Sequence, residues 1–195
     1  MELHFRKITE DDLEMIMTWR TLPEVTVYMY TDFEPDIDRQ RAWFRRISVD
    51  PARIDWIINV DGEDVGLVSI MEINSVHRRC VWGYYLASPS VRGKGIARSV
   101  ELNILTYVFE TLNLHKFCCE VFVSNEMVIM IHQKYGSKVE GTRPEHIYKN
   151  GQFHDIVEMG LLRSDWEKNV KGKIDYVVAK IDPVGKQLDC VDSEI

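Results

Sequence analysis

A short glycine-rich stretch beside several positive charges is the strongest candidate for chemistry in this sequence. Residues 90–97 read Ser-Val-Arg-Gly-Lys-Gly-Ile-Ala, and Gly93 and Gly95 allow the backbone to approach a ligand and turn its N–H groups inward. A helix that begins behind the glycines favours an anion at its N-terminus. Three basic residues lie within or next to the stretch: Arg92, Lys94 and Arg98. The pattern suits a pyrophosphate. A glycine-rich turn with solvated basic residues would, however, give the same sequence. Neither the glycine pattern of dinucleotide-binding folds nor the Walker pattern is complete here.

A second candidate lies in residues 121–136, where an apolar run is followed by a capped helix. Ser124 or Asn125 can cap this helix, and the glycine at position 136 can close it. Asn125, Ile129 and His132 fall on one helical face at i, i+4 and i+7. Both polar residues can therefore face one ligand. Alternatively, Asn125 is only a cap and His132 an ordinary surface or interior histidine.

The elements that must position these residues alternate between period-2 and helical patterns. Strands are predicted at residues 3–8, 54–60, 64–73, 79–87, 117–123, 139–148 and 154–162. Helices are predicted from the cap at residues 9–12 up to Pro23, and at residues 36–47, 95–112 and 125–135. The pairs Asp61-Gly62 and Asn150-Gly151 predict two tight hairpin turns. We assign residues 1–170 to one domain and leave 171–195, with a strand-like run at 174–181, as an unassigned C-terminal extension.

Composition narrows the class of protein. A length of 195 residues fits one domain, and a net charge of −7 argues against binding to nucleic acid or an anionic membrane. Four cysteines without CxxC spacing predict neither a metal site nor disulfides: Cys80, Cys118, Cys119 and Cys190. The polar N-terminus and the lack of a long apolar stretch predict a soluble cytoplasmic protein.

Taken together, these segments resemble the GNAT superfamily of N-acetyltransferases over roughly residues 3–162. The matching segments are residues 91–97, 123–125, 132–136 and 139–141. Arg92, Gly95 and Ala97 meet the family's pyrophosphate pattern, Gln/Arg-x-x-Gly-x-Gly/Ala. The resemblance implies an α/β domain with a mixed, mostly antiparallel sheet and a splayed central strand pair flanked by helices. It also implies acetyl-CoA as the acetyl donor and no metal.

The resemblance further implies a place for each part of acetyl-CoA. Backbone amides of the loop would hold the pyrophosphate: Arg92, Gly93, Lys94, Gly95, Ile96 and Ala97. The strand end would pair with the pantetheine arm: Tyr85, Leu86 and Ala87. Asn125 would bind that arm from the next helix, and Lys134 would reach a phosphate.

Catalysis in this family often uses a tyrosine where His132 stands here, and that tyrosine protonates the departing thiolate. Histidine can do the same because it gains and loses a proton near neutral pH. His132 is therefore our candidate acid, with protonation by water as the alternative. Glu72, at the end of the third strand, is our candidate base. Glu120 on the fifth strand, a water relay and purely structural roles stay open.

For the acceptor, residues 19–30 and 68–74 resemble the nucleotide-sugar N-acetyltransferase of the pseudaminic acid pathway. That resemblance implies a UDP-linked 4-amino-4,6-dideoxy sugar as the small-molecule amine. Five residues would contact it, unless the aromatic loop only packs over the core: Arg20, Tyr28, Met29, Tyr30 and His77. Arg20 would meet phosphate, and the aromatic residues would stack on uracil or sugar.

Other acceptors and another class of function are also open. Protein N-termini, such as those of ribosomal proteins, and polyamines are alternatives, and an acidic protein would suit a polyamine. The missing tyrosine would also fit a non-catalytic acetyl-CoA-binding module. The sequence allows a homodimer.

Overall fold

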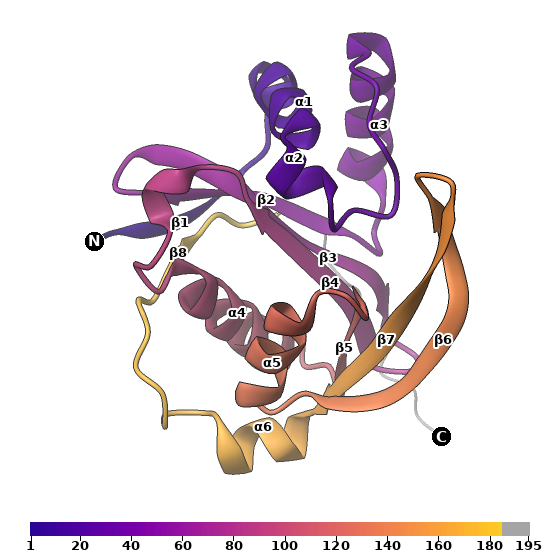
Figure 1. Ribbon diagram of the computed structural model, residues 1–195. Helices are drawn as coiled ribbons and strands as arrows, with labels where there is room; N and C mark the ends of the chain where they lie inside the picture. Colours follow the sequence, from indigo (N-terminus) through magenta and orange to yellow (C-terminus); the bar gives the residue numbers. More distant parts are fainter. Residues whose placement is uncertain (185–195) are drawn as a thin grey trace.

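The computed structural model describes residues 1–184, and its framework is a mixed sheet in the order β6-β7-β5-β4-β3-β2-β1-β8 (Figure 1). The strands are β1 (Leu3–Lys7), β2 (Ile54–Val60), β3 (Glu63–Asn74), β4 (Arg79–Leu86), β5 (Lys116–Phe122), β6 (Lys138–Lys149), β7 (Gln152–Leu162) and β8 (Lys180–Ile181). Neighbouring strands are antiparallel except β4 with β5 and β1 with β8. This confirms the predicted α/β class and the mixed, mostly antiparallel sheet.

Helices cover both faces of the sheet. They are α1 (Leu13–Thr21), α2 (Pro23–Thr26), α3 (Ile37–Val49), α4 (Ile96–Thr106), α5 (Glu126–Lys134) and α6 (Arg163–Asn169). Side chains of β2 alternate between the two faces, as strand geometry requires. Trp56 and Ile58 join the larger apolar cluster with α4 and α6, whereas Ile57 joins the smaller cluster with α1 and α3. Figure 1 shows α1–α3 on one side and α4–α6 on the other.

The central strands β4 and β5 separate soon after they meet. Their parallel pairing runs only from Arg79–Val81 on β4 to Lys116–Cys118 on β5. Beyond that point β4 stays paired with β3, and β5 with β7. Within residues 1–184, the backbone groups of β4 that face the gap therefore have no partner strand, which confirms the predicted splayed pair.

Most predicted elements are present, and four differ. Pro23 does not only end the first helix; it begins α2, because a helix needs no N–H at its first position. The predicted long helix becomes α4 followed by a π-helical turn at Tyr107–Thr111. The sequence reasoning missed α6, a seven-residue helix that is too short for a clear periodicity. Of the strand-like run 174–181, only Lys180–Ile181 pairs, with β1.

The segment beyond α6 instead closes over α4. Asn103 on α4 donates to the carbonyl of Val177 at 2.8 Å and accepts from the N–H of Ala179 at 2.9 Å. As a result residues 99–105 of α4 are buried on all sides. Residues 171–184 thus contact the main core, while 185–195, with Cys190, lie outside the described residues.

Several sequence expectations concern surface and cysteine chemistry. Cys80 and Cys119 are buried, Cys118 is half-buried, and all three are free thiols. Within residues 1–184, no helix is long and apolar enough to cross a membrane. No group of three or more metal-ligating side chains converges among the same residues.

Candidate active site

A cavity of about 820 Å³ passes through the gap between the splayed strands. One part of its wall comes from the α1–α3 side, including Arg20, Tyr28 and Trp43. Another part comes from α5, including Asn125 and His132. Its volume lies in the usual range for small-molecule sites. Two ligands can therefore enter from opposite faces of the sheet and meet between β4 and β5.

The glycine-rich loop joins β4 to α4 and has the backbone shape of an anion site. A short 3₁₀ turn, Pro89–Val91, leads into Gly93 and Gly95, both with φ +74°. Gly95 is the N-cap of α4, and only a residue without a Cβ adopts this conformation readily. A Cβ on Gly93 would point into open space, so the loop surface there is accessible. The geometry fits a pyrophosphate at the helix N-terminus.

Side chains of the loop play unequal parts. Ile96 is buried in the core, so only its backbone can serve a ligand. Arg92 is exposed and pairs with Glu24 of α2 at 3.5 Å, which links the loop to α2. Lys94 is exposed, and the guanidinium of Arg98 lies over the glycine N-cap.

The end of β4 presents its side chains to both faces. Tyr84 stacks on Trp82 toward the α5 side, whereas Tyr85 packs edge-on against Trp19 of α1. Burial raises the pKa of Tyr84 and of Tyr85, so both hydroxyls stay neutral. Tyr85 and Leu86 line the cavity, and Ala87 is fixed by donating to the carbonyl of Val65.

Asn125 and His132 point into the same cavity from α5, as their spacing predicts. Asn125 is the N-cap residue but makes no side-chain capping hydrogen bond. His132 is only 4% exposed, and its Nδ1 lies 2.8 Å from Oε1 of Glu101 on α4. Sequence reasoning missed Glu101, although a lone acid within the apolar run 100–105 was a signal. Lys134 is exposed at the end of α5 and does not line the cavity.

Arg20 on α1 lines the cavity together with Tyr28, Met29 and Tyr30 of the loop between α2 and α3. A buried lysine that sequence reasoning missed fixes this loop. Lys149, at the end of β6, donates to the carbonyls of Thr26 at 2.6 Å and Met29 at 2.8 Å. The β6–β7 hairpin therefore holds the loop in place.

Three carboxylates line the cavity, and each already has a partner. Tyr30 donates to Oε2 of Glu120 at 3.0 Å, and Arg143 lies 3.4 Å from Oε1. Glu72 sits at an irregularity of β3 with φ +50°, and its largely exposed carboxylate lies 3.9 Å from Arg79. The third carboxylate, that of Glu24, lies 3.5 Å from the guanidinium of Arg92.

His77 was predicted as a substrate residue and lies elsewhere. It is exposed in the β3–β4 turn, where its N–H donates to Oδ1 of Asn74. It does not line the cavity, so the structure gives no support for its binding substrate. This turn leads into the first residues of β4, which are still paired with β5. His77 is therefore distant along the strand from the splayed part of β4.

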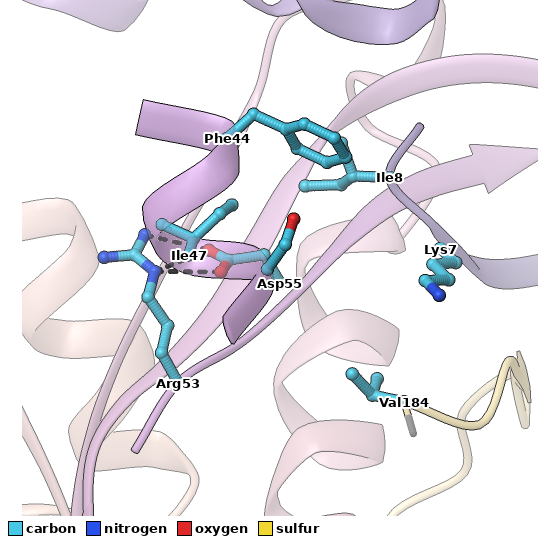
Figure 2. Close-up of a pocket in the computed structure, with 8 residues that line it drawn as sticks. Lys7, Ile8, Phe44, Ile47, Arg53, Asp55 and Val184 are labelled. Carbon is cyan, nitrogen blue, oxygen red and sulfur yellow. Dashed lines mark hydrogen bonds and ion pairs between the residues drawn. The ribbon is translucent and has the colours of Figure 1, made fainter. Parts of the chain in front are cut away.

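A second, smaller cavity of about 220 Å³ lies beside β1, α3 and β2 (Figure 2). Its polar wall is the bidentate contact between Arg53 and Asp55, and Ser69 also donates to Asp55. These groups satisfy one another, and the cavity does not reach the loop or α5. It is therefore not the candidate active site.

Comparison with known proteins connects this geometry to a family. The acetyltransferase (GNAT) domain model matches residues 2–138. Spermidine N(1)-acetyltransferase of Escherichia coli (strain K12) is 29% identical over 162 residues, 83% of this chain and 86% of that protein. Acetyltransferase PseH of Campylobacter jejuni subsp. jejuni (strain 81-176) is 22% identical over 131 residues, 67% of this chain and 80% of that protein. The expected likeness to the pseudaminic acid pathway enzyme is therefore not confirmed.

Among solved structures, spermidine N-acetyltransferase from Vibrio cholerae in complex with CoA and spermine has a similar fold. The TM-score is 0.79 at 26% identity, over 85% of this chain and 98% of that chain. The family model and the named relatives agree on the chemistry, and the shape of the glycine-rich loop is compatible with it. This chain belongs to the GNAT family and is an N-acetyltransferase whose acetyl donor is acetyl-CoA.

Proposed function

We propose that the acceptor is an amine on an anionic, nucleotide-linked sugar, of the UDP-4-amino-4,6-dideoxy type. The observation that carries the proposal is Arg20. Its guanidinium lies 5.4 Å from the ring centre of Phe33, and its Nη2 donates to Oγ1 of Thr31 at 3.5 Å. Within residues 1–184, its Nε is buried without a hydrogen-bond partner and no carboxylate forms an ion pair with it. A cation held this way beside a cavity favours an anionic group of the ligand.

The carboxylates of the cavity support the same choice. A polyamine carries several positive charges and needs unpaired carboxylates to compensate them. Glu24, Glu72 and Glu120 each lie within 4.0 Å of an arginine, whereas no acid among residues 1–184 pairs with Arg20. The cavity therefore has an unpaired cation and paired anions. Exposed Tyr28 supplies an aromatic face for uracil or the sugar ring.

Each residue of the donor side has a proposed part. Acetyl-CoA supplies the acetyl group as a thioester. The amides of residues 92–97 bind its pyrophosphate, the unpaired edge of β4 and Asn125 align the pantetheine, and Lys134 contacts a phosphate. His132 protonates the leaving sulfur, and Glu72 accepts the proton of the amine, directly or through water. The loop, the splay and the cavity wall support these roles for all but Lys134, whose part rests on the family resemblance alone.

Steady-state kinetics with thiol detection test the acceptor. We expect kcat/KM for the UDP-linked amino sugar to exceed that for the free amino sugar strongly, because the remote diphosphate orients the amine. Arg20→Ala should lower kcat/KM for the UDP-sugar by roughly 10- to 100-fold, the range for a hydrogen bond to a charged group, and leave the free sugar nearly unchanged. Arg41→Ala is the matched control, since Arg41 is paired with Asp38 outside the cavity.

A second candidate acceptor is a polyamine, because the relative from Escherichia coli and the structure from Vibrio cholerae are both named for spermidine. Spermidine therefore belongs in the same assay. Turnover of spermidine well above that of the UDP-sugar, or equal turnover of the free and UDP-linked sugars, would reject the nucleotide-sugar proposal. In the polyamine case, Arg20→Ala should raise kcat/KM for spermidine, because a like charge is removed from the cavity.

A further inference from the structure

A buried carboxylate behind the cavity has no part in the functions described so far. Glu101, in the middle of α4, is 0% exposed. Its Oε1 lies 2.8 Å from Nδ1 of His132. Its Oε2 has no hydrogen-bond partner within residues 1–184. A buried carboxylate with only one satisfied oxygen is destabilising unless something else compensates it.

The groups around Glu101 leave one source of compensation. Tyr84 on β4, Cys119 on β5 and Tyr135 at the end of α5 all have a pKa raised first by burial and then by the charge of Glu101, so all three stay neutral. Glu101 forms no ion pair with any lysine or arginine of residues 1–184. His132 is therefore the group that can place a positive charge beside this carboxylate.

The geometry of this pair also determines which ring nitrogen faces the cavity. A carboxylate can only accept, so Nδ1 of His132 must donate to Glu101. The imidazole ring is held edge-on to Trp82 with centroids 5.5 Å apart, and His132 lines the cavity. With Nδ1 occupied by Glu101, Nε2 is the nitrogen left for a ligand.

We propose that Glu101 is a positioning residue that keeps the proton on Nδ1 of His132 and stabilises the imidazolium, so that Nε2–H serves as the acid. The proposal rests on the role of His132 proposed above. It explains how this chain uses a histidine where many GNAT enzymes use a tyrosine. A tyrosine hydroxyl carries its proton unaided, whereas a neutral histidine protonated on Nδ1 has no proton on Nε2 to give.

The transfer step balances in atoms and electrons. The amine nitrogen bonds to the acetyl carbon, and the carbon–sulfur bond breaks with its electron pair moving to sulfur. The sulfur takes the Nε2 proton of His132, and the nitrogen loses one proton to Glu72 or water. His132 is left neutral with its Nδ1 proton on the hydrogen bond to Glu101, and it regains the Nε2 proton from solvent.

The first test needs no substrate. In ¹⁵N-histidine-labelled protein, His132 is assigned by the signal that disappears in His132→Tyr. We expect its Nδ1 to be protonated in the wild type, and the ring ¹⁵N shifts to change in Glu101→Gln. They should stay unchanged in Glu126→Gln, a control acid that is exposed on α5. An unprotonated Nδ1, or identical shifts in Glu101→Gln, would overturn the proposal.

The second test is kinetic. Glu101→Gln removes the charge with little change of shape, so we expect kcat to fall roughly 10- to 100-fold, part of the 10²–10⁴-fold that a general acid contributes. KM for acetyl-CoA should stay within about twofold, since Glu101 does not line the cavity. In a His132→Tyr background the same change should alter kcat by less than about twofold. An equal loss in both backgrounds would mean a merely structural role and overturn the proposal.

The two proposals fail differently. If His132→Ala lowers kcat while Glu101→Gln does not, the inference about Glu101 is wrong and the acid role of His132 stands. If neither variant changes kcat with chemistry shown to be rate-limiting, the acid role is wrong and the inference falls with it.

Discussion

Gly66 on β3 pairs with Leu86 at the end of β4, and a single added methyl group there should disturb both stability and the proposed donor site. A Cβ on Gly66 would meet the carbonyl oxygen of Tyr85 at 2.1 Å. Ordinary van der Waals contact begins at about 3.4 Å, so in Gly66→Ala the atoms must separate by about 1.3 Å. The obstacle is backbone rather than a flexible side chain. In addition, Ala87 N–H is held 2.7 Å from the carbonyl of Val65, which resists the movement.

The expected cost follows from this overlap. Overpacking in a well-packed site typically costs about 1–3 kcal/mol, and a backbone clash belongs at the upper end. For a chain of this size, about 3 kcal/mol corresponds to a fall in Tm of roughly 6–12 °C. Because the displaced residues end the strand that faces the splay, KM for acetyl-CoA should rise as well.

Differential scanning calorimetry and acetyl-CoA kinetics on one preparation measure both effects. Gly141→Ala is the matched control, since a Cβ on this β6 glycine would meet its nearest neighbour, Glu158, at an ordinary 3.6 Å. A Tm within about 2 °C of the wild type for Gly66→Ala, or an equal fall for Gly141→Ala, would refute the reasoning.

Two further predictions concern the donor loop and acid stability. Gly95→Asp should abolish acetyl-CoA binding in isothermal titration calorimetry, because a φ of +74° disfavours a side chain and a carboxylate repels phosphate. Gly62→Asp is the control: this glycine also has a positive φ but lies in the β2–β3 turn, so the variant should bind acetyl-CoA normally. Normal binding by Gly95→Asp would place the pyrophosphate elsewhere. Hydrogen bonds from Arg6 hold the pKa of Asp64 below its usual value, so the stability they provide is present above about pH 4 and is lost as pH falls further. In urea unfolding at pH 6 and pH 3.5, Asp64→Asn should lose less stability between the two pH values than the wild type, and an equal loss would contradict this linkage.

Local patterns in the sequence were enough to predict most of the fold and the shape of the loop proposed to bind the donor. The hairpin turns, the strand periods and the loop around Gly93 and Gly95 depend on neighbours in the chain, and the structure has them where they were predicted. The shared face of Asn125 and His132 is also a local property of one helix. Short or irregular elements were missed because α6 and the segment after it gain their stability from contacts with the core.

Only the tertiary structure decided which polar groups act together. The hydrogen bond between His132 and Glu101 joins residues on two helices, and Lys149 reaches a loop more than a hundred positions away in the chain. Whether Arg20 forms an ion pair likewise depends on which acids other helices and strands place near it. Burial and charge compensation are set by everything packed around a side chain, whereas sequence periodicity reports only on the element that carries it. That is why the sequence indicated the acetyl donor, while the hydrogen-bond partner of His132 and the surroundings of Arg20 required the assembled fold.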